Sequence, residues 1–341
     1  MKLPPLSCLI LLSIVHHSKS LDLSVSDPSG HVSVAFKEGQ WKVYPILIDW
    51  DVDYSVIAVA NFTNAQNTTG WMMLEVQTRE SAPDQMQAQA AGIAEGYLTR
   101  ISIIESYKEF YANDICAENP LLCKFVEETF VSNKLFVDAM IAQHFQTDPY
   151  WHQVNLYYLQ MAGMTQGYQL KAQLEPRPED AGMNHEIGIM KLNFIADFWD
   201  LIEQFNLLNG TESTSKPSKP SCTVLIKFLE EKRDIFFGHN TWHEYRAMSY
   251  RILKNYNLNV HVLPDSSDRI PGHTIAMSSY AGSIASLDDF YLTSAYLATT
   301  ETTLFLWNKY VSMYFSLIDT PFYTRKKFLV YVPQITVLLL L

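Results

Sequence analysis

The chain has 341 residues, of which 36 are acidic, 25 are basic and 48% are hydrophobic. The hydrophobic share excludes an intrinsically disordered protein, and the length suffices for a substantial core in one or two domains. The formal net charge of −11 argues against a nucleic-acid partner, which would require a basic face. An anionic membrane surface would also repel such a chain on average, so a lipid would have to enter a local pocket. The composition is therefore compatible with an enzyme or with a binding protein.

Residues 1–20 have the features of a secretory signal peptide. Lys2 precedes an apolar run at residues 6–15, and small residues follow at Ser18 and Ser20, as at a cleavage site. The run is shorter than the roughly 20 residues of a membrane-spanning helix, so we expect no stable membrane span. We expect entry into the secretory pathway and a lysosomal or extracellular location, with a buried N-terminal helix as the alternative. Removal of the peptide would leave 36 acidic against 23 basic residues, a formal charge of −13.

Residues 21–208 are predicted to form strands first and helices afterwards. Alternating residues between 31 and 80, interrupted by turn residues, indicate several strands. From about residue 84 to 208, apolar residues recur at helical spacing. Helical stretches are expected at residues 125–144, 149–172 and 186–207. We interpret their aromatic and methionine stripes as core.

Three Asn-x-Ser/Thr sequences agree with the secretory route. They begin at Asn61, Asn67 and Asn209. Each lies in turn-like sequence, where a glycan could be attached. We therefore expect glycosylation at these three asparagines.

The cysteines also fit an oxidising compartment. Cys8 belongs to the signal peptide, which leaves three cysteines in the mature chain. Cys116 and Cys123 flank a segment with Pro120, which favours a bend, so we expect them to form a disulfide. Cys222 is then the odd cysteine, and an odd cysteine in a secreted chain requires an explanation.

Residues 209–221 are polar and contain two prolines, which predicts an exposed linker or pro-segment. A strand pattern begins abruptly at Cys222. Period two places Cys222, Val224, Ile226 and Phe228 on one apolar face. A charged turn then leads into a second strand at residues 234–239. The sequence thus predicts a β-hairpin with a thiol at one end.

Residues 222–320 are assigned to the same domain as the strands and helices before the linker. Here we expect a helix at residues 242–254 and strands at 260–263 and 274–277. The order of strands, helices and strands favours helices layered over a sheet. Residues 321–341 contain an apolar tail. A functional anchor and a buried strand are alternatives, but we favour an aberrant chain end.

Several chemical signatures are absent from the sequence. It contains no G-x-G-x-x-G fingerprint and no G-x-S-x-G elbow, so we expect no nucleotide cofactor and no ordinary α/β-hydrolase serine. His239 and His243 are four residues apart and could share one face of a helix. Because no third ligand is signalled, we predict no metal site and no cofactor.

The position of Cys222 indicates a particular chemistry. A thiol among apolar strand residues can simply be a small core residue. Cleavage before Cys222 would instead make the thiol part of an N-terminal residue, next to an α-amine with a pKa near 8. Such an amine can accept the thiol proton, so an N-terminal nucleophile contains its own base. The residues alone leave both interpretations open.

Further stretches resemble the phospholipase B-like (lamina-ancestor) family of lysosomal, glycosylated hydrolases. They are spread over most of residues 30–305, in the family's order. The matching stretches are Ala91–Thr99, Tyr150–Val154, Gly163–Tyr168, Ser221–Thr223, Phe237–Trp242, Ser286–Tyr291 and Glu301–Thr303.

The resemblance implies an α+β fold, the αββα sandwich of N-terminal-nucleophile hydrolases. It also implies cleavage between Ser221 and Cys222, with Cys222 as nucleophile and new N-terminus. His239 and Trp242 would lie on or beside the active-site strand. His239 is expected to act as a polarising or proton-shuttling group. The alternative is a histidine that is simply hydrogen-bonded in the core.

The resemblance ends near residues 303–306, whereas family members continue through further strands. We therefore expect a C-terminally truncated member with an incomplete sandwich. The implied substrates are acyl esters of glycerophospholipids. An amidase acting on N-acyl or peptide bonds is one alternative. The other is a non-catalytic lysosomal protein that binds a lipid or glycan. In each case a small molecule is the expected partner.

Overall fold

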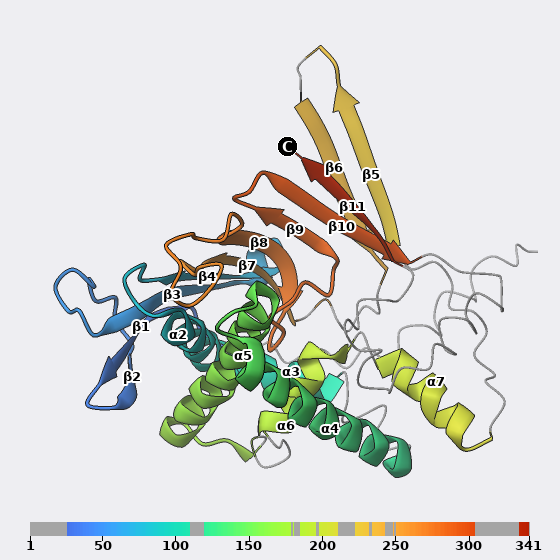
Figure 1. Cartoon of the computed structure of the whole chain (residues 1–341), viewed down its shortest axis with the longest axis horizontal. Coiled ribbons are helices and arrows are strands. Elements are labelled where there is room, and N and C mark those ends of the chain that lie inside the picture. The colour runs from blue at the N-terminus through green and yellow to red at the C-terminus, as the bar shows by residue number, and fades with distance from the viewer. Residues whose placement is uncertain are drawn as a thin grey trace, which may run out of the picture.

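The computed structural model describes residues 26–109, 119–178, 180, 185–195, 198–210, 222–231, 234–242, 248, 250–303 and 334–340. Within these residues the chain is α+β, as predicted. It combines a large mixed sheet, a separate β-hairpin and helices gathered on one side of the sheet (Figure 1). The predicted signal peptide, Cys116, Ser221 and His243 lie outside the described residues, so predictions that depend on them stay predictions.

The large sheet joins strands from both ends of the described chain. Its order is β11-β10-β9-β8-β7-β4-β3-β1-β2, and β4 and β7 are its one parallel pair among the described strands. The strands are β1 (Gly30–Lys37), β2 (Gln40–Tyr44), β3 (Val56–Ala65), β4 (Trp71–Thr78), β7 (Arg251–Asn257), β8 (Thr274–Tyr280), β9 (Phe290–Thr293), β10 (Leu297–Thr303) and β11 (Gln334–Leu340).

Of the described helices, the short α1 lies between β3 and β4, and the others lie between β4 and the hairpin in the sequence. They are α1 (Gln66–Thr69), α2 (Asp84–Leu98), α3 (Arg100–Tyr107), α4 (Pro120–His144), α5 (Pro149–Leu174), α6 (His185–Asn193) and α7 (Phe198–Leu208). The two long helices begin with a capping side chain followed by proline: Asn119 accepts from Leu122 N, and Asp148 accepts from Tyr150 N. The helical stretch predicted at 186–207 is divided into α6 and α7.

Helices α2 and α5 pack unusually closely because glycines face each other across the contact. A Cβ added at Gly92 or Gly96 would lie 1.9–2.0 Å from a carbonyl oxygen of α5. A Cβ at Gly163 or Gly167 would lie 2.0–2.1 Å from a carbonyl oxygen of α2. Only glycine permits this approach of two backbones. These glycines belong to the two helical stretches that resemble the family.

One face of the sheet is buried against α2, on which α5 packs. In β4, Met72, Leu74 and Val76 are buried, while the residues between them are not. Residues of the opposite face, such as Met73 and Leu253, are more than a third exposed. The described residues therefore form one helical layer on one large sheet. The second sheet layer of the expected αββα sandwich is not confirmed.

Two sequence predictions beyond the hairpin are wrong. Residues 251–257 form strand β7 instead of the end of a helix, and residues 260–263 form no strand but contain one isolated bridge, His261 with Arg269. The strand was missed because a charged residue, Lys254, occupies a fully buried inward position, which obscures the alternation. The predicted strand at 274–277 is confirmed as β8.

The described part of the apolar tail pairs with the sheet. Residues 334–340 form β11, which runs antiparallel to β10. This arrangement corresponds to the strand alternative for the tail. Among the described helices, none combines the length and apolar character that crossing a bilayer requires.

Candidate active site

The predicted hairpin is present and consists of β5 (Cys222–Leu229) and β6 (Asp234–Thr241). Cys222 lies opposite Thr241, and Val224 lies opposite His239. Since directly opposite residues share a face and side chains alternate along a strand, these four side chains lie on the same face. The sequence correctly predicted both strands and the position of the thiol at one end.

Cys222, His239 and Asp289 form a compact cluster at the base of the hairpin. Their Sγ, ring-nitrogen and carboxylate atoms all lie within 4.8 Å of one another, and each residue is partly buried. Cys222 is not part of a disulfide. The cluster therefore unites a thiol, an imidazole and a carboxylate from three separate segments.

Asp289 was not among the predicted site residues. It immediately precedes β9 and has a φ of 55°, in the left-handed region that aspartate tolerates better than most residues. The sequence signal for this site residue was the adjacent pair Asp288 and Asp289, which directly precedes an aromatic strand. Their proximity to the hairpin depends on tertiary structure, so spacing alone could not reveal it.

A threonine orients the imidazole. Thr241 Oγ1 donates to the Asp288 carbonyl oxygen at 3.0 Å and lies 3.2 Å from His239 Nδ1. A hydroxyl has one proton, and the carbonyl takes it. The second contact is therefore satisfied by His239 Nδ1–H donating to Thr241. This network assigns the lone pair of neutral His239 to Nε2.

Asp288 fixes the backbone beneath the cluster. The residue is buried, and its carboxylate accepts from Arg251 Nε at 3.0 Å, from Arg251 Nη2 at 2.6 Å and from the Tyr280 hydroxyl at 2.7 Å. Ser278 Oγ donates to it as well. Burial and the neighbouring carboxylate raise the pKa of Tyr280. Asp288 thus attaches the turn that contains Asp289 to strands β7 and β8.

An aromatic contact attaches the hairpin to the sheet. The rings of Phe237 and Phe290 are stacked, with centroids 5.2 Å apart and an interplanar angle of 20°. Phe237 lies on the same hairpin face as Cys222, while Phe290 begins β9. This contact lies close to Asp289 in the sequence and supports the arrangement of the cluster.

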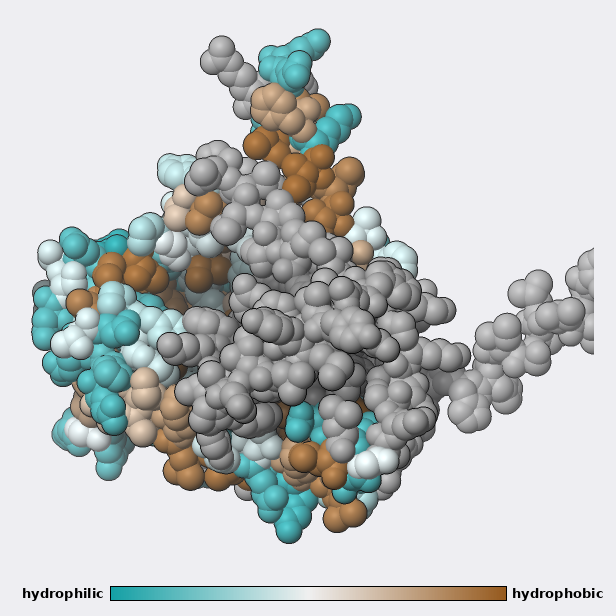
Figure 2. Space-filling model, turned by 45° about the vertical axis from the view of Figure 1, so that its right-hand side comes forward, coloured by the Kyte–Doolittle hydropathy of each residue, from teal (hydrophilic) through white to brown (hydrophobic). Residues whose placement is uncertain are grey.

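The apolar hairpin face that contains Cys222 is only partly buried. Cys222 and Val224 are half-buried, but Ile226 and Phe228 are 39% and 60% exposed. On the other face, Leu225 and Phe236 are also exposed. Figure 2 shows the resulting hydrophobic surface on the projecting hairpin. The period-two pattern correctly predicted the strand, but its apolar residues are buried only at the base.

The other predicted site residues are placed as follows. Trp242 directly follows β6 and is 59% exposed. Asn61, Asn67 and Asn209 are all exposed, which is compatible with glycosylation, but Asn61 lies within β3 and not in the turn-like segment that the sequence predicted. Cleavage at Ser221, the Cys116–Cys123 disulfide, the glycans and a role for Trp242 stay predictions.

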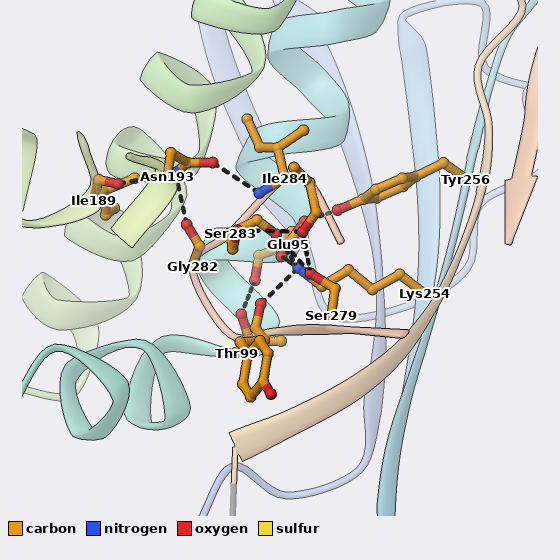
Figure 3. Close-up of polar contacts among 12 residues, drawn as sticks. Glu95, Thr99, Ile189, Asn193, Lys254, Tyr256, Ser279, Gly282, Ser283 and Ile284 are labelled. Atoms are coloured by element: carbon orange, nitrogen blue, oxygen red, sulfur yellow. Dashed lines mark hydrogen bonds and ion pairs between the residues drawn. The ribbon is translucent and has the colours of Figure 1, made fainter. Parts of the chain in front are cut away.

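A second polar group lies between α2 and β7 (Figure 3). Lys254 Nζ is 2.7 Å from Glu95 Oε1, and both side chains are fully buried. Lys254 also donates to the carbonyl of Tyr280 at 2.8 Å, and the Tyr256 hydroxyl donates to Glu95. Burial lowers the pKa of Lys254, although the carboxylate opposes this effect. With its partners supplied by α2, β7 and β8, this group is a structural link.

The cluster at the base of the hairpin contains the groups that cysteine-dependent hydrolases use. A model of the Phospholipase B family matches residues 58–325, so the similarity continues beyond residues 303–306, where we expected the resemblance to end. The chain belongs to this family.

Individual relatives support the assignment. Phospholipase B-like 3 of Caenorhabditis elegans is 33% identical over 257 residues, 75% of this chain and 42% of the relative. Phospholipase B-like 2 of Bos taurus is 34% identical over 252 residues, 73% of this chain and 41% of the relative. Phospholipase B-like protein C of Dictyostelium discoideum is 29% identical over 279 residues, 76% of this chain and 46% of the relative. The chain spans less than half the length of these relatives.

Proposed function

We propose that the protein is a phospholipase B-like hydrolase that removes acyl chains from glycerophospholipids with Cys222 as its nucleophile. The observation that carries this proposal is the proximity of the Cys222 thiol, the His239 imidazole and the Asp289 carboxylate. Family membership supports the hydrolase class and a lipid ester as substrate. Exposed apolar side chains on the same hairpin offer a surface for an acyl chain.

The nucleophile is generated by cleavage of the Ser221–Cys222 peptide bond. The Cys222 thiol transfers its proton to His239 and attacks the Ser221 carbonyl carbon. Collapse of the tetrahedral intermediate breaks the C–N bond, protonates the Cys222 nitrogen and leaves a thioester. Water then hydrolyses the thioester. The products are a Ser221 carboxylate and an N-terminal Cys222 with its thiol and α-amine.

Ester hydrolysis repeats this chemistry on the substrate. The thiolate attacks the ester carbonyl, and the glycerol oxygen leaves with a proton from the α-amine or His239. Water attacks the resulting acyl-thioester and releases the fatty acid. Asp289 stabilises the protonated imidazole, and Thr241 keeps the ring in the tautomer whose Nε2 accepts protons.

Two alternatives have specific support. Thiol attack on a carbonyl applies equally to amides, so the same cluster is compatible with an amidase acting on N-acyl or peptide bonds. Exposure of Leu225, Phe228 and Phe236 is compatible with a lipid-binding protein without turnover, because exposed apolar patches mark interaction sites.

Hydrolysis assays with matched variants test the proposal. Purified protein is incubated with phosphatidylcholine vesicles and, separately, with an N-acyl amide, and the released fatty acid is quantified. Cys222→Ala and His239→Ala are expected to abolish release from phosphatidylcholine, while His31→Ala, which alters an exposed histidine on β1, keeps wild-type activity. Release from the amide alone would support the amidase. Vesicle binding without release, unchanged in Cys222→Ala, would support the binding protein.

A further inference from the structure

The Cys222–His239–Asp289 cluster also has the composition of a metal site. Its three ligand atoms come from the start of β5, from β6 and from the turn before β9, and all lie within 4.8 Å of one another. Around a tetrahedral zinc ion, a sulfur and a nitrogen ligand are about 3.5 Å apart, given the usual bond lengths. Closing the cluster by about 1 Å would therefore be enough to coordinate one ion.

We propose that these three side chains bind a soft divalent cation, with Zn²⁺ as the preferred ion. Thiolate and imidazole ligands select Zn²⁺ over Mg²⁺ and Ca²⁺, which prefer oxygen ligands. Three protein ligands also leave a fourth position for water. On binding, the Cys222 thiol releases its proton to solvent and the sulfur becomes a ligand.

Neighbouring hydrogen bonds support this site. A metal-bound histidine usually donates its other ring N–H to a nearby acceptor, which fixes the ring. His239 Nδ1 has such an acceptor in Thr241 Oγ1, so Nε2 is the nitrogen that would face the ion. Asp289 is held by the anchored Asp288 beside it, which accepts both bonds from Arg251.

Metal binding would inhibit the thiol, because a sulfur bound to Zn²⁺ is not available to attack a carbonyl. If the proposed cleavage occurs, the new α-amine of Cys222 adds a fourth ligand and closes a five-membered chelate with the thiolate. The expectation that the α-amine becomes a fourth ligand rests on the proposed function. It predicts that the cleaved form binds the ion more tightly than the uncleaved form.

Cobalt substitution tests the site independently of hydrolysis. Co²⁺ is titrated into the purified full chain, and absorption by a thiolate–cobalt bond is recorded, followed by displacement with Zn²⁺. One equivalent of Co²⁺ is expected to produce the band, and Zn²⁺ but not Mg²⁺ or Ca²⁺ is expected to remove it. Cys222→Ser should lose the band, and Asp289→Asn should weaken binding at least tenfold, while His31→Ala should match the wild type.

The inference is overturned if no thiolate–cobalt band forms, or if Cys222→Ser retains it. Circular dichroism of each variant shows that a lost band does not result from unfolding. Hydrolysis is measured separately in buffer with a chelator. Activity there without any cobalt band would refute the metal site and leave the proposed function intact. A cobalt band in a protein that shows neither cleavage nor hydrolysis would support the metal site and contradict the proposed function.

Discussion

The thiol, imidazole and carboxylate of the hairpin site differ in what each is expected to contribute. Under the proposed function, Cys222 would form the covalent bond, His239 would move the proton and Asp289, in the same cluster, would supply negative charge. Thr241 and Asp288 have supporting roles, since they hold the ring tautomer and the turn. This division predicts different consequences for substitutions that are close together in space.

Replacement of Asp289 by Asn tests the role of the carboxylate. The amide has nearly the same size but cannot stabilise a protonated His239, so the hydrolysis rate is expected to fall by about 10²-fold, with little change in KM. Steady-state kinetics with phosphatidylcholine provide the measurement. Asp265→Asn, at an exposed loop position, is the matched control. Equal rates in Asp289→Asn and the wild type would exclude the proposed role.

The buried pair of Glu95 and Lys254 predicts a strong effect on stability. Glu95→Leu leaves a buried ammonium without its carboxylate, and the free energy of unfolding is expected to fall by about 3–5 kcal/mol. Adding Lys254→Met removes the uncompensated charge and should recover most of this loss. Urea unfolding of both variants provides the comparison. A double variant no more stable than Glu95→Leu would contradict the account.

At the scale of elements, close contact of α2 and α5 determines how the helical layer covers the sheet. Gly167→Ala would place a methyl group 2.0 Å from the Ile93 carbonyl oxygen. Alanine favours a helix by about 1 kcal/mol over glycine, but the overlap is expected to outweigh this gain. A net loss of about 1–3 kcal/mol in unfolding free energy follows.

Thermal and urea unfolding measure this change. Gly238→Ala is the control, because a Cβ at that position meets nothing within 4 Å and the backbone has ordinary φ. Its unfolding free energy should change by less than about 0.5 kcal/mol. If both substitutions had equally small effects, the helices would not be in the described contact.

Asp84 links α2, α5 and the loop that contains His261, and this contact predicts a pH dependence of stability. It begins α2 and contacts His152 Nε2 on α5 at 2.9 Å and His261 Nδ1 at 2.8 Å. Burial by itself raises the pKa of Asp84, but the hydrogen bonds from the two histidines hold it below its usual value of 3.8. The resulting stabilisation is complete above the unfolded pKa and is lost as pH falls through the folded pKa.

Urea unfolding between pH 3 and pH 7 checks the sign. The wild type should lose stability below about pH 4, and Asp84→Asn should lose less over the same interval because one carboxylate no longer titrates. Asp265→Asn serves again as the exposed control. Identical pH profiles for the wild type and Asp84→Asn would show that Asp84 does not contribute in this way.

Local periodicity was sufficient to predict several elements but not the contacts between them. The strands between residues 31 and 80 and the hairpin from Cys222 follow period two, so they were predictable. Strand β7 was not predictable from periodicity, because Lys254 occupies a buried position in it. The buried lysine is paired with Glu95 on α2, a distant residue that the local pattern cannot reveal. Asp289 is 67 residues beyond Cys222, and tertiary contacts such as the Thr241–Asp288 hydrogen bond and the Phe237–Phe290 ring pair link the hairpin to the turn that contains it.

At the scale of the whole molecule, the distal part of the β5–β6 hairpin exposes several apolar side chains among the described residues. The outer face of the sheet is mixed, because Met73 and Leu253 lie on it beside exposed polar residues such as Glu75. The chain spans less than half the length of the relatives it matches. Under the proposed function, hydrolysis by this chain requires that Cys222 become an N-terminal nucleophile.

The most direct measurement is intact mass and N-terminal sequencing of the purified protein after incubation at neutral and acidic pH. The account predicts a fragment that begins at Cys222 in the wild type and an unbroken chain in Cys222→Ala. His31→Ala should be cleaved like the wild type. An unbroken wild-type chain, or the same fragment from Cys222→Ala, would contradict the claim that Cys222 cuts its own peptide bond and becomes the N-terminal nucleophile.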